Sequence, residues 1–286
     1  MKVLVFGETG QVARALALAG PARGITVQTL NRGSADLSDP AACAAAIMAT
    51  DADAVINAAA WTAVDAAEDQ EDAAHVINAA APGAMAQACA ARGLPFVQIS
   101  TDYVFDGSAG DPWTPDGATA PLGAYGRTKL AGERAVLDSG ALAVVLRTAW
   151  VFDGVGRNFV TTMLRLSETR DALSVVADQI GGPTPADAIA DACLTIAQKL
   201  VDGTAQTGIH HFSGAPDVSW ATFARAIFDT AGRAVTVTDI TTADYPTPAA
   251  RPANSRLDCT SLKDAFGIPR PDWQAALTRI IKEVTP

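Results

Sequence analysis

The first half of the chain alternates short, nearly continuous apolar runs with longer alanine-rich segments, and this alternation restricts the fold most strongly. Uninterrupted apolar runs are typical of parallel strands that are buried on both faces. The predicted strands are Val3–Phe6, Ile25–Leu30, Ala54–Asn57, Pro95–Ile99 and Ala143–Arg147, and the helices predicted between them are Gln11–Ala19, Pro40–Ala49, Glu68–Arg92 and Ala124–Ser139. Repeated strand–helix units form a parallel sheet with right-handed crossovers. We therefore predict an α/β fold with a doubly wound parallel sheet.

The second half is less regular and predicts a smaller second unit. Its predicted helices are Asn158–Thr169, Ala186–Leu200, Trp220–Ala231 and Asp272–Glu283, and its predicted strands are Leu173–Ala177 and Gly208–Phe212. Three prolines between Thr241 and Arg256 indicate an ordered loop. No Gly/Ser-rich linker separates two independent domains. We expect a sheet domain over residues 1–150 and about 172–207, interleaved with a substrate-binding lobe over about 151–171 and 208–286.

The composition narrows the class of partner. The 286 residues carry a net charge of −10, with 49% hydrophobic and 18% charged residues. This balance argues against disorder, and the acidic charge argues against general nucleic-acid binding, which uses basic side chains to neutralise phosphates. No uncharged apolar run approaches the roughly 18 residues of a membrane span, and no signal-type segment precedes the first strand. The four cysteines are widely spaced, as in a reducing compartment. We expect a cytoplasmic protein with a small-molecule ligand and no nucleic-acid or membrane partner.

A glycine-containing loop follows the first predicted strand directly. Gly7 and Gly10 allow a tight turn and a close approach of the backbone to a pyrophosphate at the start of the next helix. Thr9, Gln11 and Val12 belong to the same loop and would contact the dinucleotide. The loop is also compatible with a purely structural turn, because a short glycine motif alone is weak evidence.

The end of the second predicted strand bears on the choice of cofactor. Many NAD-binding folds carry an acidic residue about 20 residues after the loop, where it binds the ribose hydroxyl. This chain has Arg32 there, which fits the 2′-phosphate of NADPH and equally fits a solvated loop cation. Asp36 and Leu37 would lie beside the adenine, although Asp36 also fits a helix start before Pro40. We predict NADPH as the cofactor and leave NADH open.

Tyr125 and Lys129 lie four residues apart in a predicted helix, so their side chains share one face. A nearby ammonium lowers the pKa of a phenol, whose reference value is about 10. Such a pair suits proton transfer to or from a sugar or alcohol oxygen. The spacing alone also arises by chance on solvated helix faces, so the other motifs decide what it means.

Seven segments together resemble a known family. They are Gly7–Val12, Asn57–Asp65, Ser100–Gly107, Tyr125–Lys129, Arg147–Phe152, Asp178–Thr184 and Arg251–Leu257. In this order they resemble the extended short-chain dehydrogenase/reductases and, more narrowly, the dTDP-4-dehydrorhamnose reductase family. The resemblance implies a Rossmann-type sheet domain with a smaller C-terminal substrate domain. It also implies NADPH-dependent reduction of the C4 ketone of dTDP-4-dehydro-β-L-rhamnose to dTDP-β-L-rhamnose, in dTDP-rhamnose biosynthesis.

The same resemblance implies roles for individual residues. Tyr125 would donate a proton to the developing C4 alkoxide, and Lys129 would lower the Tyr125 pKa and bind the nicotinamide ribose. Thr101 would hydrogen-bond the substrate oxygen or Tyr125. Further cofactor contacts are expected at Ala58, Ala59, Ala60 and Thr62, and substrate contacts at Thr101, Asp102, Tyr103, Val104, Trp150, Gln179, Arg251 and Asn254. The competing interpretations are close packing for the alanines, a turn cap for Asp102, core packing for Trp150 and a solvated loop for Arg251.

Two positions depart from the family pattern. Trp61 stands where tyrosine or histidine is frequent, and Ala15 stands where some members carry a glutamate that binds magnesium at a dimer interface. We therefore expect no metal site, and both a monomer and a homodimer remain open. His210 and His211 are adjacent on a predicted strand and would point to opposite faces, so we do not expect them to share a metal ion.

Two other functions remain open. An NDP-sugar epimerase or dehydratase of the same superfamily is one alternative, although a dehydratase would favour an Asp-Glu pair where this chain has Asp102 and Tyr103. The other alternative is a regulatory subunit that binds dinucleotide without catalysis. The presence of Thr101, Tyr125 and Lys129 together argues against that alternative.

Overall fold

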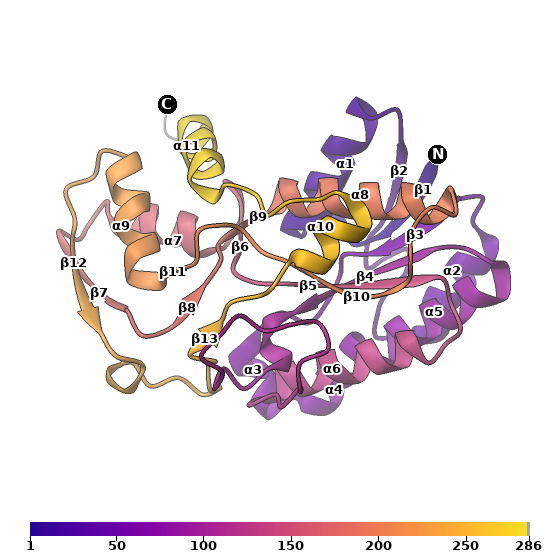
Figure 1. Ribbon diagram of the computed structural model, residues 1–286, viewed down its shortest axis with the longest axis horizontal. Helices are drawn as coiled ribbons and strands as arrows, with labels where there is room; N and C mark the ends of the chain where they lie inside the picture. Colours follow the sequence, from indigo (N-terminus) through magenta and orange to yellow (C-terminus); the bar gives the residue numbers. More distant parts are fainter. Residues whose placement is uncertain (285–286) are drawn as a thin grey trace.

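The computed structural model describes residues 1–284 and contains a six-stranded parallel sheet (Figure 1). The strand order is β10-β5-β4-β3-β1-β2. The bounds are β1 Lys2–Phe6, β2 Thr26–Leu30, β3 Ala54–Asn57, β4 Phe96–Thr101, β5 Ala143–Thr148 and β10 Gly208–Phe212. Every pair of neighbours in this sheet is parallel. The predicted α/β class with a doubly wound parallel sheet is therefore confirmed.

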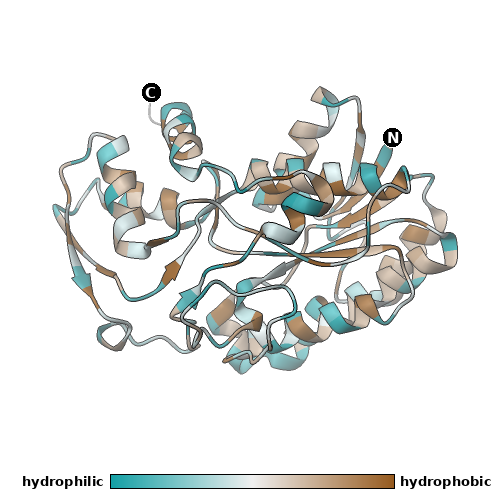
Figure 2. Cartoon of the chain, in the orientation of Figure 1, coloured by the Kyte–Doolittle hydropathy of each residue, from teal (hydrophilic) through white to brown (hydrophobic). Residues whose placement is uncertain are grey.

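Helices cover both faces of this sheet, and the strands between them are mostly hydrophobic (Figures 1 and 2). The helices α1 Gln11–Ala22 and α8 Ala186–Val201 lie on one face, and α2 Pro40–Ala49, α5 Ala81–Arg92 and α6 Ala124–Leu137 lie on the other. Successive side chains of a strand point to opposite faces. In β1, Val3 and Val5 therefore pack in the core with α1 and α8, whereas Leu4 and Phe6 pack in the core with α2 and α5.

The segment before α5 is broken where the sequence predicted one continuous helix from Glu68. It contains α3 Val64–Asp69, α4 Glu71–His75 and the π-helical turn η1 Val76–Ala80. Gln70 separates α3 from α4 with a non-helical φ of −134°. The π turn faces α6 at Gly132, where a Cβ atom would lie 2.0 Å from the Asn78 carbonyl oxygen. Glycine at that position thus allows α6 and η1 to pack backbone against backbone.

The remaining elements form a second unit with its own core. Its helices are α7 Phe159–Leu166, α9 Trp220–Thr230 and α11 Trp273–Val284, and they pack with the parallel pair β7 Ala172–Val176 and β12 Thr236–Ile240. Two small sheets connect this unit to the first: β6 Val151–Phe152 with β9 Thr184–Pro185, and β11 Val218–Ser219 with β8 Ile180–Gly181 and β13 Asn254–Ser255. The short helices η2 Asp102–Val104, η3 Thr242–Asp244 and α10 Thr260–Phe266 complete the fold.

Three segments differ from the predicted organisation. The strand β10 was expected in the lobe but pairs with β5 at the edge of the large sheet. The strand β7 was expected in the sheet domain but pairs with β12 in the second unit. The predicted loop from Thr241 contains η3 and β13. The pattern of single strands predicts that they exist but does not indicate which partner each will pair with.

We therefore propose a domain division with corrected boundaries. The sheet domain takes in β10 and α10, whose Leu262 and Phe266 pack in its core. The lobe takes in β7, together with α7, α9 and α11. Within the described residues, no helix combines the length and apolarity needed to cross a membrane.

Candidate active site

A cavity of about 470 Å³ opens at the carboxyl ends of β1, β3, β4 and β5. Ligands of open parallel sheets bind at this edge, and the volume lies in the range of small-molecule sites. Its walls include Thr9, Gly10, Gln11, Val12, Ala58, Ala59, Ala60, Thr62, Thr101, Asp102, Tyr103, Tyr125, Lys129 and Trp150. These are sequence-predicted cofactor, catalytic and substrate residues, and the fold brings them to one place.

The glycine loop forms one wall of this cavity. Gly7 has a φ of +111°, and a Cβ atom there would lie 3.3 Å from the Ala13 side chain and 3.4 Å from the Ala58 carbonyl. Gly7 itself makes the turn and does not line the cavity. Gly10 is the N-cap of α1 and provides no side-chain cap for the first N–H groups of the helix. Free N–H groups at a helix start suit an anionic ligand, so this wall fits the pyrophosphate of a dinucleotide.

The loop after β3 forms the neighbouring wall, and buried amides hold it in place. Asn57 accepts a hydrogen bond from the Ala59 N–H (3.2 Å) and donates to Gln98 (2.9 Å). Asn78 accepts from the Trp61 N–H (2.9 Å) and donates to the Trp61 carbonyl (3.2 Å). The Trp61 backbone is therefore fixed from η1, while the small side chains at 58–60 line the cavity.

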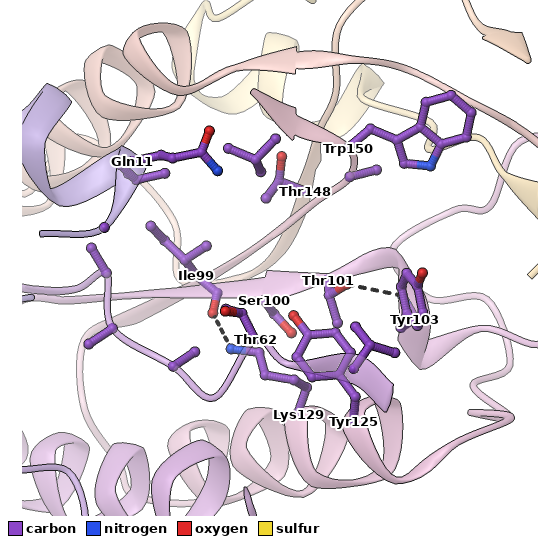
Figure 3. Close-up of a pocket in the computed structure, with 18 of the residues that line it drawn as sticks. Gln11, Thr62, Ile99, Ser100, Thr101, Tyr103, Tyr125, Lys129, Thr148 and Trp150 are labelled. Carbon is purple, nitrogen blue, oxygen red and sulfur yellow. Dashed lines mark hydrogen bonds between the residues drawn. The ribbon is translucent and has the colours of Figure 1, made fainter. Parts of the chain in front are cut away.

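The predicted catalytic residues meet between α6 and the end of β4 (Figure 3). Tyr125 and Lys129 project from one face of α6, as their spacing predicted. The Lys129 Nζ donates to the Ile99 carbonyl at 2.7 Å. The Thr101 hydroxyl donates to Asp102 Oδ1 at 3.0 Å and accepts from the Tyr103 N–H at 3.2 Å. The site thus places a phenol, an ammonium and a hydroxyl on one cavity.

Two contacts position α6. The Glu68 carboxylate of α3 accepts from the Ala124 N–H at 2.8 Å and so caps the helix, whose N-cap residue Gly123 has no side chain. Gly126 faces η2 so closely that a Cβ atom would lie 2.2 Å from the Tyr103 carbonyl oxygen. The Tyr103 and Tyr125 rings then meet edge to face, with centroids 5.5 Å apart.

Burial dominates the electrostatics of this site. It raises the pKa of Tyr125 to about 12, and a hydrogen bond with Thr101 opposes that rise. It lowers the pKa of Lys129 to about 8, although the Glu133 charge acts in the opposite direction. Burial also raises the pKa of Asp102 to about 6. We expected the ammonium of Lys129 to lower the Tyr125 pKa, but desolvation of the phenolate dominates, and the Lys129 charge is not among the effects that shift this pKa.

Buried polar atoms without partners mark where a ligand would be received. Within residues 1–284, three buried side-chain oxygens lack a hydrogen-bond partner: Gln11 Oε1, Asp102 Oδ2 and Thr148 Oγ1. All three residues line the cavity. Since a buried polar atom without a partner costs about 1–3 kcal/mol, these atoms fit hydrogen bonds to a polar ligand such as a dinucleotide or a sugar.

Trp150 lies where the sheet domain meets the lobe. It follows β5 with a φ of +50°, a conformation that costs a non-glycine residue roughly 1–3 kcal/mol. Its ring stacks on Trp220 of α9, with centroids 3.6 Å apart. A Cβ atom at Gly181 would lie within 3.0 Å of the same ring. The ring is therefore fixed on two sides while the residue lines the cavity.

The other predicted ligand contacts do not line the cavity. The side chain of Arg32 is 86% exposed and lies 3.9 Å from Asp36, while Leu37 and Val104 are buried. Arg251 pairs with Asp65 at 2.7 and 3.0 Å. Gln179 donates to Thr242, and Asn254 donates to the carbonyls of residues 109 and 111. Their roles as ligand contacts stay predictions.

Sequence reasoning missed part of the cavity wall. Arg14 donates to the Thr9 carbonyl, to the Val155 carbonyl (3.0 Å) and to Asp153 (2.8 Å), which ties the glycine loop to the segment after β6. Arg14 could have been identified from the sequence as a cavity residue, because it is a basic residue one helical turn after Gly10. The segment around residue 155 carries no such signal, because only the tertiary fold brings it to the loop. Ser100 and Thr148 also line the cavity, and each directly follows a predicted strand.

The histidines face different neighbours. His210 lies 3.1 Å from the Ser261 hydroxyl, and His211 Nδ1 lies 3.0 Å from the Trp113 carbonyl. Among residues 1–284, no cluster of three or more His, Cys, Asp or Glu side chains is arranged to hold a metal ion.

The chain is similar to characterised families and structures over its full length. The family profile described as the RmlD substrate binding domain matches residues 1–285. A dTDP-4-dehydrorhamnose reductase of Sinorhizobium fredii is 43% identical, over 98% of this chain and 97% of the relative. The crystal structure of a dTDP-4-dehydrorhamnose reductase from Clostridium acetobutylicum is 36% identical, with 100% of both chains covered and a TM-score of 0.94. That of the Bacillus anthracis reductase in complex with NADP is 31% identical, with 99% of both chains covered and a TM-score of 0.92.

Proposed function

The chain belongs to the RmlD substrate binding domain family, and on that basis we propose that it reduces the C4 ketone of dTDP-4-dehydro-β-L-rhamnose to dTDP-β-L-rhamnose with NADPH. One observation carries the proposal. Tyr125, Lys129 and Thr101 line the same cavity as the glycine loop, so a proton donor stands opposite a dinucleotide-binding wall. The full-length relatives named for this reaction support the same choice of substrate.

The cavity fits the cofactor on its own features. The Gly7 turn and the N-terminus of α1 would hold the pyrophosphate. Gln11 and Thr148 offer unpartnered oxygens to polar groups of the ligand. The small residues 58–60 and Thr62 line the space between the glycine loop and α6. When bound, NADPH supplies the hydride for C4.

Tyr125 acts as the proton donor in this proposal. Its raised pKa, about 12, keeps the phenol protonated at neutral pH, so the proton is available when negative charge develops on the C4 oxygen. The Thr101 hydroxyl hydrogen-bonds the same oxygen or Tyr125. Lys129, charged below about pH 8, binds the ribose hydroxyls and stabilises the phenolate that remains after proton transfer.

The substrate would be held where the sheet domain meets the lobe. Asp102, Tyr103 and Trp150 line the cavity beside Tyr125, and the fixed Trp150 ring offers an apolar face to the sugar or base. Gln179, Arg251 and Asn254 would reach the dTDP part from the β8 and β13 region. A cytoplasmic location, and a monomer or homodimer as the assembly, complete the proposal.

The test is a spectrophotometric assay of NADPH oxidation with enzymatically prepared dTDP-4-dehydro-β-L-rhamnose. We expect turnover with NADPH and identification of dTDP-β-L-rhamnose as the product. A protein that binds NADPH but oxidises neither NADPH nor NADH with this ketosugar would refute the reductase function. Product analysis also separates reduction from epimerisation, because an epimerase returns an isomeric ketosugar without net loss of NADPH.

A further inference from the structure

A fully buried ion pair lies beside the cavity and has no part in the roles proposed above. Arg147 of β5 donates to the carboxylate of Glu133 of α6, from Nε at 2.9 Å and from Nη2 at 2.6 Å. The two side chains are 2% and 1% exposed. Because desolvation offsets most of the attraction within a buried pair, a gain in stability does not by itself explain why it lies here.

The guanidinium of this pair is fixed from several directions. Arg147 Nη1 donates to the Pro115 carbonyl at 3.1 Å and lies 3.4 Å from His211 Nε2. The guanidinium carbon lies 5.0 Å from the centre of the Phe105 ring. Burial lowers the pKa of His211 to about 3, so the imidazole is neutral and does not repel the guanidinium. The Glu133 carboxylate is therefore held in one position by a guanidinium that is itself fixed.

The same carboxylate lies on the face of α6 that carries Lys129. Glu133 follows Lys129 by one helical turn on α6, so the two side chains share a face. Both reach consecutive residues of β4: Lys129 donates to the Ile99 carbonyl, and the Ser100 hydroxyl donates to Glu133. Burial lowers the pKa of Lys129 to about 8, and the negative charge of Glu133 limits this decrease.

Other ionisable groups near this part of α6 do not replace Glu133. They are Tyr125 on α6, Asp102 and Tyr103 on η2, Arg147 on β5, His211 on β10, Glu68 on α3, and Glu71 and His75 on α4. Glu68 caps the α6 N-terminus and Glu71 pairs with Arg127, and neither carboxylate is among the causes of the Lys129 pKa shift. Within residues 1–284, Glu133 is the group whose charge raises the Lys129 pKa.

We propose that Glu133, fixed by Arg147 and Ser100, is a positioning residue that keeps Lys129 charged in the reaction. The inference rests on the proposed reductase function. In this arrangement the charge on Lys129 does not depend on the ligand, because the compensating anion is part of the protein. Arg147 contributes indirectly: its two hydrogen bonds hold the carboxylate in place, and it does not contact substrate or cofactor.

The test is the pH dependence of kcat/KM in Glu133→Gln and wild-type protein. In the wild type, kcat/KM should fall as pH rises through about 8, because Lys129 loses its proton there. An opposite charge within about 4–6 Å changes a pKa by about 1–3, and side chains one helical turn apart, such as Lys129 and Glu133, are neighbours on the helix surface. In Glu133→Gln the alkaline limb should therefore move to lower pH by about 1, which reduces kcat/KM about fivefold at pH 8.

Three further variants separate this effect from misfolding. The double variant Glu133→Gln with Arg147→Met removes both charges of the buried pair, so it replaces the single variant if that protein does not fold. The alkaline limb of its kcat/KM profile should also move to lower pH. Glu133→Asp keeps the charge and should retain the wild-type limb. Glu71→Gln breaks an exposed Glu–Arg pair that joins α4 to Arg127 of α6, and it should leave the alkaline limb in place. Folded Glu133→Gln or double variants with an unmoved limb would overturn the proposal, whatever their loss of rate.

A second measurement keeps this test separate from the proposed reaction. The affinity for NADPH, followed by its fluorescence across the same pH range, should weaken as Lys129 loses its charge, and it should weaken at lower pH in Glu133→Gln. If the wild type binds NADPH but does not turn over the ketosugar, the proposed substrate is wrong and the binding titration still decides the role of Glu133. A binding transition at the same pH in both proteins would contradict that role.

Discussion

At the scale of single residues, the pKa of Tyr125 determines whether the phenol holds a proton before the reaction begins. Burial raises its pKa to about 12, so the phenol carries its proton throughout the physiological range. A reductase needs the protonated phenol, because the alkoxide that develops in the reaction must receive a proton. The Tyr–Lys spacing predicts the pair, but it does not predict how deeply both side chains are buried, and burial determines their pKa values.

The first prediction concerns Tyr125→Phe. The phenyl ring fills nearly the same space but has no proton to donate, so kcat should fall about 10²–10⁴-fold. The affinity for NADPH, measured by fluorescence titration, should change little. A variant with near-wild-type kcat would show that another group supplies the proton.

The second prediction concerns Arg32→Ala. The exposed guanidinium is available to a 2′-phosphate, so its loss should weaken NADPH binding more than NADH binding. Dissociation constants for both cofactors, measured in parallel, provide the comparison. Equal weakening of the two would remove Arg32 as the source of cofactor preference.

The sequence predicts residues inside local motifs better than it predicts long-range partners. The glycine loop, Thr101, Tyr125 and Lys129 are each recognisable from their neighbours and line one cavity. Arg251 was expected to contact a phosphate, but its nearest carboxylate belongs to Asp65, 186 positions away in the chain. No local pattern contains that pairing, since it depends on how the lobe folds back over α3.

At the scale of elements, the position of α6 governs the site, and two glycines set that position. Gly126 allows α6 to approach η2, and Gly132 allows it to approach the π turn. The sequence predicts the helix itself from its composition and length. It does not predict the π turn, because that turn is stabilised by packing against another helix rather than by its own residues.

The third prediction concerns Gly126→Ala. Alanine in a helix normally gains about 1 kcal/mol over glycine, but here its Cβ would lie 2.2 Å from a backbone oxygen that cannot rotate away. We expect a net loss of about 1–3 kcal/mol of unfolding free energy, measured by chemical denaturation, and a lower kcat as Tyr125 moves. Gly110→Ala is the control, because nothing lies within 4 Å of its Cβ position. If Gly126→Ala had the same unfolding free energy as Gly110→Ala, α6 would be able to shift away from η2 without cost.

At the scale of the whole molecule, the stack of Trp150 on Trp220 joins the sheet domain to the lobe beside the cavity. Trp150 continues from β5, whereas Trp220 begins α9, and the strained φ of Trp150 is held by this packing. Substrate affinity should therefore depend on a lobe residue that does not line the cavity.

The fourth prediction concerns Trp220→Leu. Loss of the stack should raise the KM for the ketosugar about two- to tenfold, the range expected from an aromatic pair worth about 0.5–1.5 kcal/mol. Trp220→Phe keeps a stacking ring and should retain most of the affinity. The KM and the NADPH dissociation constant are measured together, and a parallel change in both would mean that the stack supports the whole fold instead.

The return of the chain to the large sheet at β10 limits how the sugar specificity of such a protein can evolve. The chain passes into the lobe after β5, comes back for α8 and β10, leaves again for α9 and returns once more at α10. No single cut separates the two units, and a truncation before residue 208 would leave β5 as an open edge. The lobe is not one continuous segment, so it cannot be exchanged between relatives as a unit. A change in sugar specificity therefore has to arise by substitutions of individual residues, each compatible with the packing of the large sheet.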